Sequence, residues 1–193
     1  MDMWNNKAME KFVTNVGLIT SDGPHGHNVM AAEWTHMLSY KPGMICVAIG
    51  HDKATANNIR ATKEFGVSLT SVAQTSAASV AGNYSGKEHN KINALKELGV
   101  RFYGGKKIKA LMVSGAAANL ECRLVKEIVL GDHTLFVGKI LNASAGGAEP
   151  VAYHSGKYWA LTRGIKKPTE TARKTMRGIV EKHKKRLNSD ARE

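Results

Sequence analysis

Three short segments combine residue types that bind a polar, phosphorylated ligand. In the first, residues 28–35, small side chains flank an asparagine and a tryptophan. A flat ligand can approach the backbone closely there, so that main-chain N–H and C=O groups bond to its edge. An ordinary strand with a packed tryptophan has the same composition, and that alternative stays open. The candidate ligand-binding residues of this segment are Asn28, Val29, Met30, Ala31, Ala32, Trp34 and Thr35.

The second segment, residues 51–58, leads into a predicted helix. Lys53 supplies a positive charge and Thr55 a hydroxyl, and the first helical turn adds free N–H groups. These groups together are what a phosphate needs. Asn58 follows within the same predicted helix. In the alternative interpretation, Thr55 only caps a surface helix.

The third segment places Gly86 between the hydroxyl of Ser85 and the ammonium group of Lys87. This composition is typical of loops that bind anions and equally of an ordinary turn. This third segment indicates a binding site only in combination with the other two.

Other site chemistries find little support. His25 and His27 lie in a Gly/Pro loop with no second ligand pair nearby, so we expect no metal site. Cys46 and Cys122 lie in apolar runs and are interpreted as inert core thiols, which fits the cytoplasm. The chain has no G-x-S-x-G, Walker A or G-x-G-x-x-G motif, which argues against a hydrolase and a dinucleotide-binding fold.

Composition narrows the class of protein further. The 193 residues are 42% hydrophobic and 23% charged, which excludes a largely disordered chain. No apolar run is long enough to span a membrane, and the polar first residues lead us to expect no secretory signal. The net charge of +12 is uneven, because residues 163–193 hold eleven Lys/Arg against four Asp/Glu. This basic tail leaves nucleic-acid binding open, although a solvated helix face is the favoured interpretation.

The pattern of elements that must position these segments is mainly β. Apolar or alternating runs predict strands. The first covers residues 13–21, and residues 120–130 and 133–141 form two long ones around a Gly-Asp turn. Short helices are predicted at residues 56–65, 74–81 and 92–98. We therefore expect a β-barrel with helices over residues 1–162. Residues 163–193 form a basic extension with a C-terminal amphipathic helix, whose apolar stripe is Ala172, Met176, Ile179, Val180, His183 and Leu187. We expect this stripe to pack on the barrel or on a partner subunit.

Taken in order, six segments resemble one family, the flavin reductase-like, FMN-binding split β-barrel proteins of the flavoredoxin type. They span about residues 12 to 160 and follow the family's order and approximate spacing. The longest one, at residues 118–141, is the most specific. The segments are NVMAAEWTH (28–36), KPGMICVAIG (41–50), KATANNIRATKEFGVSL (53–69), YSGKEHNK (84–91), ANLECRLVKEIVLGDHTLFVGKIL (118–141) and PVAYHSGKYW (150–159).

This resemblance implies a Greek-key-like split barrel that forms a homodimer and binds one flavin per subunit, FMN or else FAD. The residues that would line the isoalloxazine ring are Asn28, Ala31, Ala32, Trp34 and Thr35, and Glu33 would point away from it. Lys53, Thr55 and Asn58 would hold the phosphate, and Ser85, Gly86 and Lys87 would form a second loop beside it. His154 matches a catalytic position near the flavin, where a nicotinamide docks in some members.

The implied function is that of an oxidoreductase in the cytoplasm. Electrons would come from NAD(P)H or a redox partner and leave to a flavin, a ferric chelate or a protein, while the protein binds and orients the cofactor. One alternative is an FMN-binding electron carrier without nicotinamide turnover. Another is a barrel that binds nucleic acid through its basic tail, which we do not favour. We expect no membrane partner.

Overall fold

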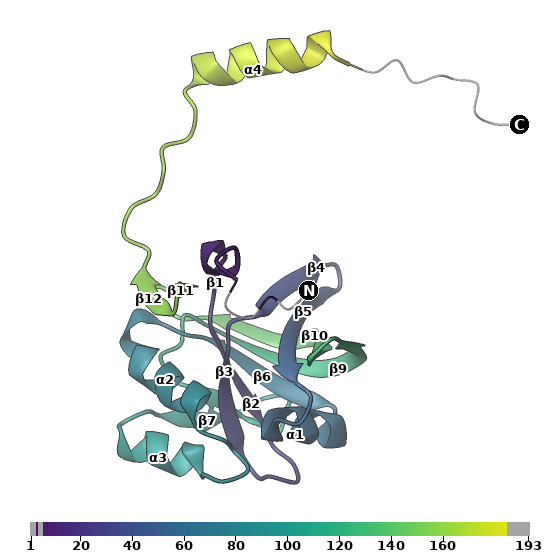
Figure 1. Ribbon diagram of the computed structural model, residues 1–193, viewed down its shortest axis with the longest axis vertical. Coiled ribbons are helices and arrows are strands. Elements are labelled where there is room, and N and C mark those ends of the chain that lie inside the picture. The colour runs from purple at the N-terminus through teal and green to yellow at the C-terminus, as the bar shows by residue number, and fades with distance from the viewer. Residues whose placement is uncertain (1–2, 4–5, 185–193) are drawn as a thin grey trace, which may run out of the picture. The chain divides into compact units, whose positions relative to one another are not determined.

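The computed structural model describes residue 3 and residues 6–184 (Figure 1). The chain divides into two units, Met1–Leu161 and Thr162–Glu193. Among the described residues, the first unit holds twelve strands and three α-helices. Its strands are β1 (Val13–Thr14), β2 (Gly17–Ser21), β3 (Asn28–Ala32), β4 (Thr35–Tyr40), β5 (Gly43–Gly50), β6 (Glu64–Leu69), β7 (Phe102–Gly104), β8 (Leu111–Val113), β9 (Ala118–Leu130), β10 (His133–Ala145), β11 (Val151–His154) and β12 (Lys157–Ala160). Its helices are α1 (Ala54–Thr62), α2 (Thr75–Asn83) and α3 (Lys91–Glu97), with 3-10 turns at Met9–Lys11 and Val72–Gln74.

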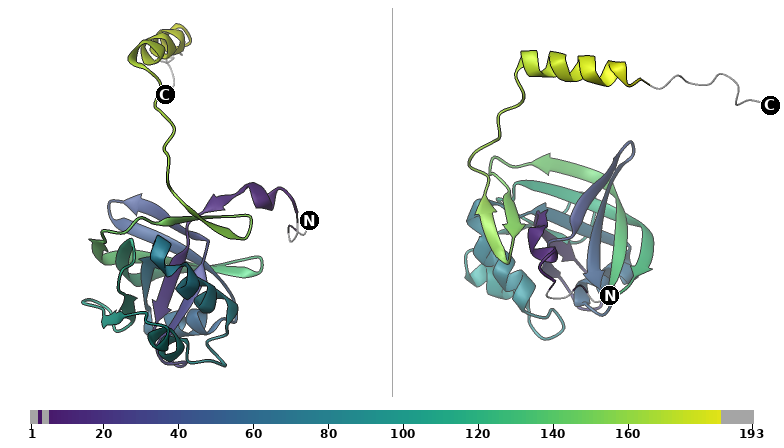
Figure 2. Two further views of the ribbon diagram at one scale, coloured as in Figure 1. Left: turned by 90° about the vertical axis from the view of Figure 1, so that its left-hand side faces the viewer. Right: turned by 45° about the horizontal axis from the view of Figure 1, so that its top comes forward.

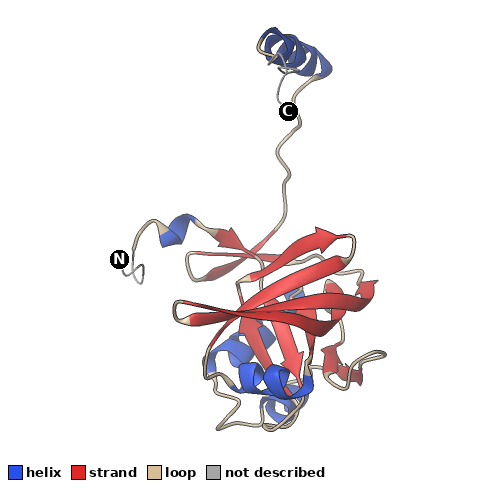
Figure 3. Cartoon of the chain, turned by 90° about the vertical axis from the view of Figure 1, so that its right-hand side faces the viewer, coloured by secondary structure: helices blue, strands red, loops and turns tan. Residues whose placement is uncertain are grey.

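Seven antiparallel strands form the main sheet, in the order β3-β2-β6-β9-β10-β5-β4. The two long strands β9 and β10 run through its middle, and the sheet curls around a common core (Figure 3). The connection from β5 to β6 passes through α1 and crosses two strands, which gives the Greek-key-like topology. The predicted fold class, mainly β with a barrel and helices, is confirmed.

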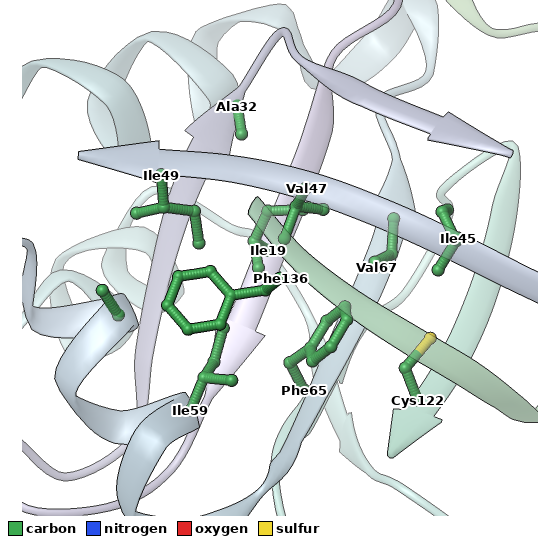
Figure 4. Close-up of a cluster of buried hydrophobic side chains, with 11 residues drawn as sticks. Ile19, Ala32, Ile45, Val47, Ile49, Ile59, Phe65, Val67, Cys122 and Phe136 are labelled. Carbon is green, nitrogen blue, oxygen red and sulfur yellow. The ribbon is translucent and has the colours of Figure 1, made fainter. Parts of the chain in front are cut away.

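The barrel interior is filled by aliphatic and aromatic side chains from opposite strands (Figure 4). Phe65 of β6 and Phe136 of β10 are fully buried at its centre. A Cβ atom on Gly138 would lie 2.9 Å from Cys122 Cβ and nearer still to the Phe65 ring, so this close approach requires glycine. Cys122 is completely buried, and burial raises the pKa of its thiol to about 12, as expected of an inert core thiol.

A second apolar cluster lies between β2, β3 and the helices α2 and α3, which lie side by side (Figure 2). Its buried members include Leu18, Val29, Ala78 and Leu95. Residues 99–100 end α3 as predicted, because Gly99 has φ +84° and the N–H of Val100 donates to Leu95 O at 2.9 Å. The helices therefore hold the Tyr84–Lys91 loop against β3.

Two predicted elements differ from the structure. The helix predicted over residues 56–65 ends at Thr62, because Lys63 adopts φ 60° and donates its N–H to Ile59 O. Phe65 then turns into the barrel core as part of β6. The strand predicted over residues 13–21 is divided, since β1 pairs with β11 and β2 pairs with β3 and β6.

The described part of the second unit, residues 162–184, forms one helix, α4 (Glu170–Lys182). Thr169 caps its first turn, with Oγ1 accepting from the N–H of Ala172 at 3.2 Å. Met176, Ile179 and Val180 share one face of the helix, as the sequence predicts, whereas Leu187 lies outside the described residues. No helix in the described part of the chain combines the length and apolar character that crossing a membrane requires. Packing of the apolar stripe on the barrel or on a partner subunit stays a prediction.

Candidate functional site

The three polar segments of the sequence meet in one small pocket of about 190 Å³, which we call the polar pocket. The start of β3, the start of α1 and the loop after α2 form its walls. The first turn of α1 follows Lys53, which makes no side-chain capping bond, so its backbone N–H groups have no cap. The lining residues are Asn28, Met30, Lys53, Ala54, Thr55, Ala81, Gly82, Asn83, Tyr84, Ser85, Gly86 and Lys91.

Lys91 is the most unusual group in the polar pocket. Its side chain is buried, with 3% of the residue exposed, and its Nζ donates one hydrogen bond, to Ala81 O at 3.0 Å. No carboxylate of the described residues forms an ion pair with it. Burial lowers the pKa of Lys91 to about 8, and the positive charge of Lys53 adds to this effect. The positive charges of Lys91 and Lys53 lie at one pocket whose lining contains no carboxylate, so an anionic ligand would be favoured there.

The hydroxyl of Thr55 is held ready to donate a hydrogen bond. Asn28 Nδ2 donates to Thr55 Oγ1 at 2.8 Å, both groups being buried, so the hydroxyl proton is left for another acceptor. Gly86 packs directly against Asn28, since a Cβ atom at Gly86 would lie 2.8 Å from Asn28 Nδ2. Thr55 therefore does not cap α1, which was the alternative interpretation of this residue.

Two larger cavities continue from the polar pocket along β3. A middle cavity of about 400 Å³ shares Gly82 and Asn83 with the polar pocket and is lined by Ala31. It shares Glu33, Tyr153 and Gly156 with an outer cavity of about 670 Å³. The three cavities, which we call the groove, run beside an edge strand, because β3 pairs with β2 alone among the described strands. Part of the β3 backbone therefore has no strand partner on the groove side.

Trp34 and His154 line the outer cavity. His154 Nδ1 lies 3.2 Å from Phe12 O, so this nitrogen carries the proton and Nε2 is left as the acceptor when the ring is neutral. Glu33, which we expected to point away from the ligand, lines both the middle and the outer cavity. Burial, together with the charge of Glu33, raises the pKa of the neighbouring Tyr153.

The family model that describes a flavin reductase like domain matches residues 9–162, which hold all the lining residues of the groove except Asn6 of the outer cavity. The chain belongs to the flavin reductase-like family. The resemblance found in the sequence is thereby confirmed, and the protein is a flavin reductase-like oxidoreductase.

The chain is also similar to individual proteins. A protein of Archaeoglobus fulgidus is 40% identical over 121 residues, which are 63% of this chain and 67% of the relative. The ferric-chelate reductase (NAD(P)H) of the same organism is 26% identical over 166 residues, covering 86% of this chain and 95% of the relative. The flavoredoxin of Desulfovibrio vulgaris (Miyazaki F) shares the fold, with a TM-score of 0.72, 24% identity and coverage of 82% of this chain and 92% of that one.

The flavin reductase-like fold distributes the residues predicted from the sequence over different surroundings. Asn28, Met30, Lys53, Thr55, Ser85 and Gly86 line the polar pocket, Ala31 the middle cavity, and Trp34 and His154 the outer cavity. Lys87 lines a neighbouring cavity instead. Val29, Ala32, Thr35 and Asn58 are buried and line none of these cavities.

Asn58 has a structural task in this flavin reductase-like protein. Its Oδ1 accepts from the N–H of His25 at 2.9 Å, and its Nδ2 donates to Gly26 O at 2.9 Å and to Ser21 Oγ at 3.1 Å. Its side-chain hydrogen bonds are therefore used within the protein, and it fixes the loop that carries His25 and His27.

Sequence reasoning missed Lys91 and the end of α2. Lys91 begins a short helix with apolar spacing, which gives no sign that its own side chain is buried. That burial depends on packing against α2, whose Ala81 carbonyl accepts from the ammonium group. Among the described residues, no group of three or more His, Cys, Asp and Glu side chains is arranged to hold a metal ion.

Proposed function

We propose that this protein is a flavin reductase that holds the ribityl phosphate of its flavin in the polar pocket and the ring along the unpaired edge of β3. The observation that carries the proposal is the buried ammonium group of Lys91, which has no carboxylate partner among the described residues and shares its pocket with Lys53. The phosphate of FMN, a dianion, balances both charges, and the corresponding phosphate of FAD, which carries one negative charge, balances one of them. FMN and FAD both have a phosphate at this position, so the polar pocket by itself accepts either.

The donor set also fits a phosphate. Thr55 and Ser85 present hydroxyl groups, and the uncapped first turn of α1 presents backbone N–H groups. A pocket of about 190 Å³ takes the phosphate end of a flavin and leaves the ring to the larger middle cavity. Backbone groups of β3 beside Ala31 would then bond to the polar edge of the ring and orient it.

A flavin bound in the groove would accept a hydride from NADH or NADPH and pass electrons to free flavin, to a ferric chelate or to a protein partner. The protein residues bind and orient, and hydride transfer needs no acid–base pair. We place the nicotinamide in the outer cavity, against Trp34 and His154. The names of two relatives, a ferric-chelate reductase (NAD(P)H) and an NADH-dependent flavin reductase, support this choice of donor and acceptors.

A homodimer in the cytoplasm is part of the proposal. The edge strand β4 exposes Met37, Leu38 and Tyr40, at 50%, 52% and 90% of their surfaces, next to His36 of the outer cavity. A cluster of exposed apolar side chains on an edge strand is typical of an interface. The two buried free cysteines fit a reducing compartment.

Anaerobic mixing tests the function directly. We expect protein loaded with flavin to lose its flavin absorption band within seconds when NADH or NADPH is added, because the outer cavity brings the nicotinamide to the ring. Stopped-flow absorbance measures the rate. A flavin that stays oxidised with both nucleotides, but is reduced by dithionite, would indicate an electron carrier without nicotinamide turnover. Protein that binds neither FMN nor FAD would overturn the proposal.

Single substitutions test the polar pocket. We expect Lys53→Ala and Thr55→Ala each to weaken FMN binding about fivefold or more, since each removes one phosphate partner. Isothermal titration calorimetry measures the affinity. Lys126→Ala is the matched control, because Lys126 is an exposed lysine of β9 that lines none of the cavities. Affinity that is unchanged in the first two variants would remove both residues from the site.

A further inference from the structure

A fourth cavity, of about 380 Å³, lies on the other side of the Ser85–Gly86 loop. Its lining includes the imidazole rings of three histidines, His25, His27 and His89, and the side chains of two lysines, Lys87 and Lys96. We call it the histidine cavity. Gly86 lines both this cavity and the polar pocket, so the two are neighbours across one residue without a side chain. The proposed function gives none of these side chains a task.

The walls of the histidine cavity are fixed by hydrogen bonds. Asn58 holds the backbone of His25 and Gly26, and Asn57 Nδ2 lies 3.2 Å from His25 Nε2. On the opposite wall, the N–H groups of Glu88 and His89 both donate to Ser85 O, at 3.2 and 3.0 Å. The cavity is therefore formed before a ligand binds, which is typical of binding clefts.

The chemistry of the lining selects an anion with a flat polar ring. Lys87 and Lys96 outnumber the one carboxylate of the lining, Glu88. Imidazole rings offer flat faces for stacking as well as nitrogen atoms that donate or accept hydrogen bonds. A nucleoside phosphate has both features. A nucleoside phosphate is also too large to fit into the polar pocket, of about 190 Å³, together with a first phosphate.

The position of the cavity decides which nucleotide fits. A nicotinamide dinucleotide would extend from the outer cavity, at the opposite end of the groove. A ligand group in the histidine cavity would instead continue from the phosphate in the polar pocket, because the loop at Gly86 borders both cavities. In FAD, adenosine monophosphate is attached at that phosphate, whereas FMN ends there.

We propose that the histidine cavity binds the adenosine monophosphate half of FAD, so that FAD and not FMN is the preferred flavin. This rests on the proposed function, because it takes the ribityl phosphate to lie in the polar pocket. Lys96 and Lys87 pair with the second phosphate, and the imidazole rings contact the adenine. Asn58 is a positioning residue that holds His25 in place.

Calorimetric titration of the flavin-free protein with FAD and with FMN tests the proposal. We expect the wild type to bind FAD at least about tenfold more tightly than FMN, since FAD adds a second phosphate group that contacts Lys87 and Lys96 and one stacked ring. Lys96→Ala should weaken FAD binding about threefold or more and leave FMN binding unchanged. The double variant Lys87→Ala/Lys96→Ala should lose more affinity for FAD than for FMN. Lys126→Ala is again the control for loss of a surface charge.

Adenosine monophosphate is a second probe. We expect it to compete with FAD and to leave FMN binding unchanged, because it occupies only the histidine cavity. Equal affinities for the two flavins, or a Lys96→Ala variant that weakens both equally, would overturn the adenylate site while the flavin site stands. Failure to bind either flavin would instead overturn the proposed function, and with it this inference.

Discussion

Lys91→Met is expected to change flavin affinity and protein stability in opposite ways. Affinity for FMN or FAD falls about 10- to 100-fold, because the variant loses a charged partner of the phosphate in a buried setting. The flavin-free protein becomes more stable by about 1–3 kcal/mol, since a methionine of similar shape replaces a buried charge that has no carboxylate partner among the described residues. Calorimetric titration measures the first change and urea unfolding the second.

The matched control for this variant is Lys53→Met. Lys53 contributes charge to the same pocket but is exposed, so this variant should lose affinity without gaining stability. A Lys91→Met protein that is less stable and binds flavin normally would show that Lys91 supports the fold and not the ligand.

The pH dependence of protein stability and of flavin affinity provides a second test of Lys91. The pKa of Lys91 is about 8 in the fold and near its ordinary value of 10.5 in the unfolded chain. Between these values the unfolded chain holds a proton that the fold has released, so the contribution of Lys91 to stability rises with pH across this window. A bound phosphate favours the charged form, so flavin affinity should fall as pH rises past about 8. Both dependences should disappear in Lys91→Met.

The polar pocket shows how far local sequence signals reach. The sequence reveals two local patterns: a lysine and a threonine at the start of a helix, and a glycine beside a hydroxyl. The fold brings residues of both patterns, Lys53, Thr55 and Gly86, together in one pocket. Asn58 has the same local signal, but its amide bonds to a loop more than 30 residues earlier in the chain. Lys91 has no local signal, because its burial depends on the packing of α3 against α2.

The fold follows the same rule. The β9–β10 hairpin was predictable because alternating residues and a Gly-Asp turn specify it within 28 consecutive residues. The end of α1 was not predictable from the sequence, because Phe65 is compatible with a helix. Its packing in the barrel core with Phe136 and Cys122 places it in β6 instead. Tertiary burial overrides helix propensity at such a residue.

Gly86→Ala is expected to weaken flavin binding about tenfold or more without touching any charge. A Cβ atom at this position would overlap the carboxamide of Asn28, which lies 2.8 Å from it at Nδ2. Asn28 is buried and cannot yield without losing its hydrogen bond to Thr55, so the threonine hydroxyl loses its fixed orientation toward the phosphate. Calorimetric titration with FMN measures the loss, and circular dichroism checks that the variant is folded.

A double-mutant cycle separates this effect from a general disturbance of the loop. Asn28→Ala removes the carboxamide that the new methyl group would meet, so adding Gly86→Ala to it should cost little further affinity. Gly147→Ala is the control for a glycine in open surroundings, since a Cβ atom there meets no atom within 4 Å. If the two losses were simply additive, Gly86 would matter for the path of the loop and not for its contact with Asn28. A non-additive cycle would tie the packing of Gly86 to the hydroxyl of Thr55, through the one side chain that touches both.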